Sequence, residues 1–119
     1  MLTQTPLAIN MEMNSPRPER RVAALFILLA MLSLLSGLLY GTLGAGQYIF
    51  PELLKTKLSF SQSRPLHVYL VINWIFSAAA GGIYYYLPWI SGGRKIFSPA
   101  LAFIHFGLQL LVWIMVVTG

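Results

Sequence analysis

The sequence contains no cysteine and no aspartate, and each absence excludes a class of chemistry. Without cysteine there is no disulfide, no thiolate nucleophile and no cysteine-ligated zinc or iron–sulfur centre. Acidic residues are so few that a mechanism based on paired carboxylates is almost excluded within this chain. They are Glu12, Glu19 and Glu52.

Charged residues of either sign are also scarce. They make up 9% of the sequence, against 57% hydrophobic residues, whereas soluble domains average about 25% charged residues. The chain is therefore not a soluble domain. Its net charge of +5 is no sign of a nucleic-acid partner, because the basic residues flank apolar runs, as topology signals do in membrane proteins.

Three apolar segments predict an all-α integral membrane protein with three transmembrane helices, at about residues 22–46, 65–87 and 99–118. We expect residues 1–21 to form a polar, mostly disordered cytoplasmic tail that ends in basic residues. A cleaved signal peptide is the weaker interpretation, because the uncharged run from residue 22 to residue 51 far exceeds an h-region of about 7–15 residues.

The first segment carries small residues at successive spacings of four: Ser33, Gly37, Gly41 and Ala45. They form one face that allows a neighbouring helix to approach closely, or they reflect the ordinary enrichment of glycine in membrane helices. The connection over residues 51–63 is expected to be an amphipathic segment on the membrane surface. Ser98 and Pro99 are expected to be the N-cap and first residue of the third helix.

The second segment organises the chain. Pro65 suits the first turn of a helix, and 23 residues up to Leu87 would extend about 33 Å, enough to cross a hydrocarbon core of about 30 Å. Lys and Arg residues favour a cytoplasmic N-terminus by five to three, which places His67 near the outer surface. The five are Arg17, Arg20, Arg21, Arg94 and Lys95; the three are Lys55, Lys57 and Arg64.

His67 is the main candidate for chemistry. A neutral imidazole near the end of a membrane helix is a good ligand for haem iron, although an interfacial histidine in contact with headgroups is the plain alternative. Arg64, one turn earlier, suits an anionic group such as a haem propionate or a lipid phosphate. The same face of the second segment continues beyond His67 with Val71, Trp74, Ala78 and Gly81. Either a large flat ligand or a closely packed helix would suit this face.

His105 and Gln109 share a face of the third segment and are expected to form interhelical hydrogen bonds rather than a metal site. Asn73 and Ser77 are expected to do the same from the second segment. His105 and His67 cannot clamp one haem, because their depths in the membrane differ by about 20 Å.

Several motifs together resemble a known family. The second segment resembles the second transmembrane helix of the catalytic subunit (subunit I) of the haem-copper oxidase superfamily. The motifs that carry the resemblance are Arg64-Pro65-Leu66-His67, Trp74-Ile75-Phe76, Gly81-Gly82 and residues 84–88, preceded by residues 58–61. The pattern is most similar to the nitric oxide reductase branch and the C-family oxygen reductases. Val68 and Tyr69 depart from the pattern, because relatives often have a small polar residue directly after the histidine.

The resemblance implies that His67 is one axial ligand of a low-spin, b-type haem and that Arg64 lies near the haem propionates. It also implies a bacterial or archaeal plasma membrane, and quinol or cytochrome c as electron donor. The chain would form the first three of about twelve helices, while the opposite haem ligand and the binuclear centre would come from later helices. We therefore expect a fragment or a split piece that is not catalytic alone; the alternative is a small three-span accessory or assembly protein without haem.

Overall fold

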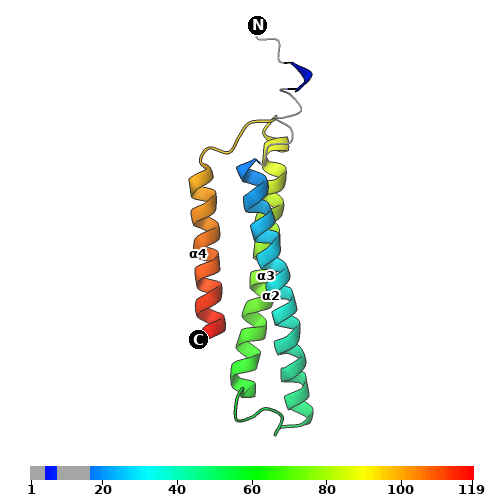
Figure 1. Cartoon of the computed structure of the whole chain (residues 1–119). Helices are drawn as coiled ribbons and strands as arrows, with labels where there is room; N and C mark the ends of the chain where they lie inside the picture. The colour runs from blue at the N-terminus through cyan, green and yellow to red at the C-terminus, as the bar shows by residue number, and fades with distance from the viewer. Residues whose placement is uncertain (1–4, 8–16) are drawn as a thin grey trace.

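The computed structural model describes residues 5–7 and 17–119. Over these residues three long helices and no strand occur: α2 (Pro18–Ile49), α3 (Phe60–Ile90) and α4 (Pro99–Thr118). Each is long and apolar enough to cross a membrane, with mean hydropathies of 2.6, 1.5 and 2.2 for their most apolar windows. The structure confirms the predicted all-α, three-helix membrane architecture (Figure 1).

Helix α2 begins four residues before the predicted span, so residues 18–21 are helical and not part of an irregular tail. Pro18 is its first residue, where a missing N–H has no consequence for the helix. Glu19 follows in the first turn, where the helix dipole favours a negative charge. The rest of the predicted tail lies mostly outside the described residues, and the limits of the membrane spans stay predictions.

Helix α3 begins at Phe60, so the expectation that Pro65 opens it is wrong. The backbone N–H of Ser59 donates to Gln62 Oε1 at 3.2 Å, an interaction found in a capping box at a helix N-terminus. Pro65 is tolerated inside the helix because the carbonyl that it leaves without an N–H partner belongs to Ser61, which is exposed. His67 is therefore the eighth residue of the helix.

The connection between α2 and α3 consists of turns and a bend over residues 51–58, and its place on the membrane surface stays a prediction. Gln47 at the end of α2 fixes the connection, because its Nε2 donates to the carbonyls of Leu53 (3.0 Å) and Leu58 (2.5 Å). These side-chain bonds to backbone carbonyls hold the segment as a compact loop at the end of the helix pair.

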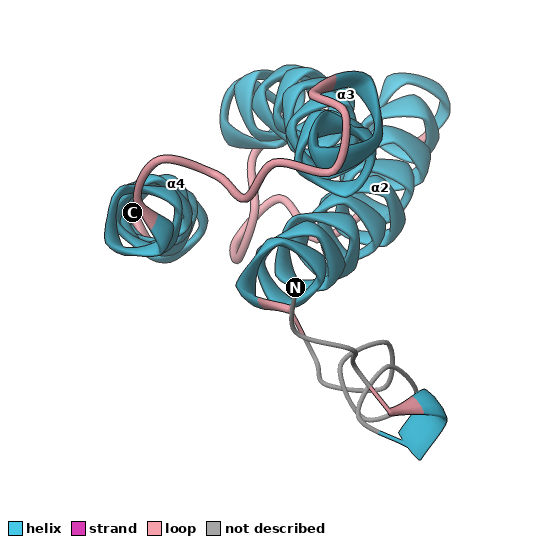
Figure 2. Ribbon diagram, turned by 90° about the horizontal axis from the view of Figure 1, so that it is seen from above, coloured by secondary structure: helices cyan, strands magenta, loops and turns pink. Residues whose placement is uncertain are grey.

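Helices α2 and α3 form an antiparallel pair, and α4 stands beside it (Figures 1 and 2). Glycines allow the close approach within the pair. A Cβ added to Gly37 would lie 3.4 Å from Leu70 Cβ, and one added to Gly81 would lie 2.8 Å from Ile27 Cδ1. Of the small-residue face predicted for the first segment, Ser33, Gly37 and Gly41 contact α3 as expected, whereas Ala45 is exposed.

A polar network at Asn73 joins all three helices. Asn73 Nδ2 donates to Ser33 Oγ at 2.8 Å, and Gln109 Nε2 donates to Asn73 Oδ1. The expected interhelical hydrogen bonds of Asn73 and Gln109 are confirmed. The expectation for Ser77 is wrong, because its buried hydroxyl has no hydrogen-bond partner.

The network predicts a measurable loss of stability. Asn73→Ala removes both interhelical hydrogen bonds, and because such bonds contribute on average about 0.6 and at most about 1.7 kcal/mol each in membrane proteins, we expect a loss of about 1–2 kcal/mol. The measurement is the free energy of unfolding in mixed micelles titrated with a denaturing detergent. Ser77→Ala is the matched control, since it removes a buried hydroxyl that bonds to nothing. An equal loss in both variants would contradict the role of the network.

Candidate functional site

The imidazole of His67 packs directly against the backbone of α2. Its Nδ1 lies 2.7 Å from the carbonyl oxygen of Gly37. A carbonyl can only accept, so Nδ1 carries the proton in this hydrogen bond, and in the neutral ring Nε2 keeps its lone pair. A Cβ at Gly41 would lie 2.7 Å from both Nδ1 and Cε1. The glycine therefore provides the space in which the ring sits.

His67 and Arg64 lie in one groove between α2 and α3, as a shared haem site requires. The groove has a volume of about 230 Å³, and Gly41 and Gly44 form part of its floor. It is lined by Tyr40, Gly41, Gly44, Ala45, Tyr48, Phe60, Arg64 and His67. The guanidinium of Arg64 is exposed and forms no ion pair; over the described residues, the only such pair joins Lys55 and Glu52.

The groove at His67 is too small to enclose a haem by itself. Its volume of about 230 Å³ is below the range of about 300–1,000 Å³ of pockets that enclose a small-molecule ligand. The donor set nevertheless suits the group, because an imidazole of fixed tautomer stands beside an unpaired cation and two glycines. A second side would have to be supplied by other helices.

Two of the four residues on the face further along α3, Val71 and Gly81, lie in contact with α2. A Cβ added to Gly37 would lie 3.6 Å from Val71 Cγ2. A Cβ added to Gly81 would lie 3.2 Å from the carbonyl oxygen of Ala23. Of the two interpretations of this face, close packing against α2 is the one observed for Val71 and Gly81.

His105 belongs to an aromatic cluster near the other end of the bundle. Its Nδ1 lies 3.1 Å from the hydroxyl of Tyr84, and its ring centroid lies 5.0 Å from that of Phe26. The predicted interhelical hydrogen bond of His105 is thus confirmed. Phe26 and Gly37, the contacts of the two histidines on α2, are eleven residues or about 16 Å apart along the helix. The two histidines therefore do not share an iron.

Within residues 5–7 and 17–119, no group of three or more His, Cys, Asp or Glu side chains is arranged to hold a metal ion.

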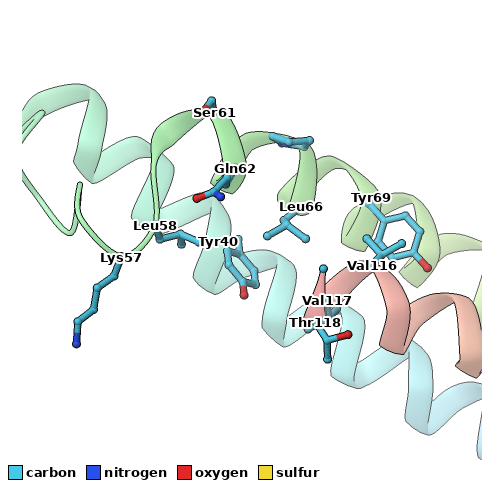
Figure 3. Close-up of a pocket in the computed structure, with 12 residues that line it drawn as sticks. Tyr40, Lys57, Leu58, Ser61, Gln62, Leu66, Tyr69, Val116, Val117 and Thr118 are labelled. Carbon is cyan, nitrogen blue, oxygen red and sulfur yellow. The ribbon is translucent and has the colours of Figure 1, made fainter.

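A larger groove on another side of α3 was not expected from the sequence (Figure 3). Its volume is about 580 Å³, and the last turn of α4 closes one side of it. It is lined by Tyr40, Lys57, Leu58, Ser61, Gln62, Pro65, Leu66, Tyr69 and residues 116–119. The hydroxyl of Tyr69 is buried and has no hydrogen-bond partner. In the sequence, the only feature that draws attention to Tyr69 is its departure from the family pattern after the histidine.

Glu19 was also missed. It is 2% exposed, and its Oε1 accepts a hydrogen bond of 3.2 Å from the backbone N–H of Ile96. This bond fixes the connection between α3 and α4 to the start of α2. Pro18 followed by an acidic residue is a signal for a helix start that would have found it.

Three long apolar helices with a histidine groove between the first two define the class of the molecule, which is a polytopic integral membrane protein. Residues 21–119 match the family model described as Cytochrome C and Quinol oxidase polypeptide I, and the chain belongs to this family, subunit I of the haem-copper oxidases. The match confirms the resemblance at the level of the superfamily. No solved structure matches the chain.

Proposed function

We propose that this chain supplies, through His67, one axial ligand of the low-spin haem in the catalytic subunit of a haem-copper oxidase. The observation that carries the proposal is the hydrogen bond from His67 Nδ1 to the Gly37 carbonyl. A backbone carbonyl in this position fixes the tautomer and ring orientation of metal-binding histidines and raises their basicity. Family membership supplies the haem chemistry to which this geometry is suited.

The residues around His67 have separate tasks in the proposed site. His67 Nε2 would ligate the iron, while Gly41 gives the ring its place. Arg64 would bind a haem propionate by charge-assisted hydrogen bonds, for which a planar guanidinium is well matched. When bound, the haem supplies one-electron transfer from quinol or cytochrome c towards a binuclear centre.

The remaining parts of the site would come from other helices of the same subunit or of a partner chain. The groove at His67 covers a ligand from one side only, and α4 has a single buried residue, Ala102. Helices packed against these open faces would provide the opposite haem ligand and the metals of the binuclear centre.

We also propose the nitric oxide reductase-like branch, or its C-family oxygen reductase relatives, on the strength of the Arg64-Pro65-Leu66-His67 motif and the Gly81-Gly82 pair. The membrane would be the plasma membrane of a bacterium or archaeon. Basic residues favour a cytoplasmic N-terminus, which places His67 near the outer face.

The test is to purify the full gene product from membranes under mild conditions and to record its reduced-minus-oxidised spectrum. We expect the narrow absorption band of a six-coordinate, low-spin b-type haem, together with the further helices of the subunit. A three-span protein that carries no haem and associates with no further helices would overturn the proposal in favour of an accessory or assembly protein.

A further inference from the structure

A second groove between α2 and α3 lies near the N-terminal end of α2, away from His67. Its volume is about 600 Å³. Nearly all the residues that line it are apolar or aromatic, and Arg20 is the one charged residue among them. The lining residues are Arg20, Ala23, Ala24, Ile27, Leu28, Met31, Gly81, Gly82, Tyr85 and Tyr86.

The two adjacent glycines of α3 explain why a hollow exists here. At Gly81 a Cβ would lie 2.8 Å from Ile27 Cδ1, so this glycine lets the helices touch. At Gly82 a Cβ would meet nothing within 4 Å. The helices are therefore close together at Gly81, while the missing side chain at Gly82 leaves the groove beside the contact empty.

The length of the groove matches one leaflet of a bilayer. Arg20 and Met31 are eleven residues apart on α2, which corresponds to about 16 Å along the helix axis. Half of a hydrocarbon core of about 30 Å is about 15 Å. The depth of the groove therefore matches an acyl chain of one leaflet.

The chemistry at the mouth of the groove matches a headgroup. Arg20 is exposed and has no ion pair among the described residues, so its guanidinium is free to bind a phosphate. Tyr85 and Tyr86 stand at the same end, and tyrosines are enriched at the depth of lipid headgroups. From the mouth inward the lining is apolar, as an acyl chain requires.

We propose that this groove binds one anionic phospholipid, with its phosphate on Arg20 and an acyl chain lying past Gly82 towards Met31. The inference does not depend on the haem proposal, because none of the lining residues belongs to the groove at His67. Failure of one proposal therefore leaves the other intact.

The test is native mass spectrometry of the full gene product, delipidated in detergent and titrated with phosphatidylglycerol or phosphatidylcholine of identical acyl chains. We expect one tightly retained phosphatidylglycerol. Arg20→Gln should lower its retention about fivefold, as loss of one basic side chain near a phosphate does, and Arg21→Gln, which does not line the groove, should lower it less. Gly82→Leu should reduce retention of both lipids by filling the groove, whereas Gly107→Leu, also in open space on α4, should not.

Equal retention of the two lipids, or a Gly82→Leu protein that keeps its phosphatidylglycerol, would overturn the proposal. So would a cross-link from a single cysteine introduced at Leu28 to another helix or to a second copy of the chain, because protein would then occupy the groove. The cysteine-free sequence makes that label unique within this chain.

Discussion

His67→Ala should abolish the low-spin haem absorption of the assembled oxidase. The substitution removes the imidazole whose Nδ1 is bonded to the Gly37 carbonyl, and alanine offers no donor to iron. The reduced-minus-oxidised spectrum measures the loss directly. Because a large substitution can also disturb assembly, His67→Gly with added imidazole is the second measurement: free imidazole should enter the space and restore the band.

The matched control for this experiment is His105→Ala. His105 is the other histidine of the chain, but it bonds to Tyr84 and packs on Phe26. We expect the low-spin band to persist in this variant. An unchanged spectrum in His67→Ala, or loss of the band in His105→Ala alone, would contradict the assignment of His67 as the ligand.

Gly41→Ala should weaken haem binding although it replaces no haem ligand. The new Cβ would lie 2.7 Å from the His67 ring, closer than van der Waals contact allows. The ring must then rotate away from the Gly37 carbonyl, and the loss of such a supporting hydrogen bond lowers metal affinity by about 10–100-fold. The measurement is haem occupancy per purified complex, followed by a haem-release titration with an apoprotein acceptor.

The stability of Gly41→Ala separates this effect from general misfolding. The obstacle is a side chain that can turn, not backbone, so we expect the free energy of unfolding to change by less than about 1 kcal/mol. Gly107→Ala, where a Cβ meets nothing within 4 Å, is the control for adding a methyl group to a membrane helix. Equal haem occupancy in the two variants would show that the His67–Gly37 contact does not support ligation.

Much of the fold follows from the sequence, because long apolar runs and the Ser98-Pro99 start act locally. The N-terminal end of α3, which carries His67, is an exception: the sequence predicts that the helix begins at Pro65, but it begins at Phe60. The pattern Ser59-x-x-Gln62 is a capping-box signal, but Pro65 gave a competing signal for a helix start. Local rules alone do not decide between them. The helix begins at the earlier signal, and Pro65 is accommodated near its exposed end.

The candidate site was predictable only in part. His67 and Arg64 were recognisable as residues, and the structure places both in one groove. Their partners on α2 were recognised only as small residues, because the vertical register of α2 against α3 decides which glycine meets the imidazole. That register depends on contacts such as Gly81 against Ile27 and Asn73 against Ser33. The periodicity of either segment alone does not predict it.

The sparse packing of α4 has a consequence for biogenesis. The hairpin of α2 and α3 has its own glycine contacts and hydrogen bonds, whereas only Ala102 of α4 is buried. We expect the hairpin to form as soon as its second helix leaves the translocon. Helix α4 would then join it through a few polar and aromatic contacts, such as Gln109 with Asn73 and His105 with Tyr84, and would keep most of its apolar surface open for neighbouring helices.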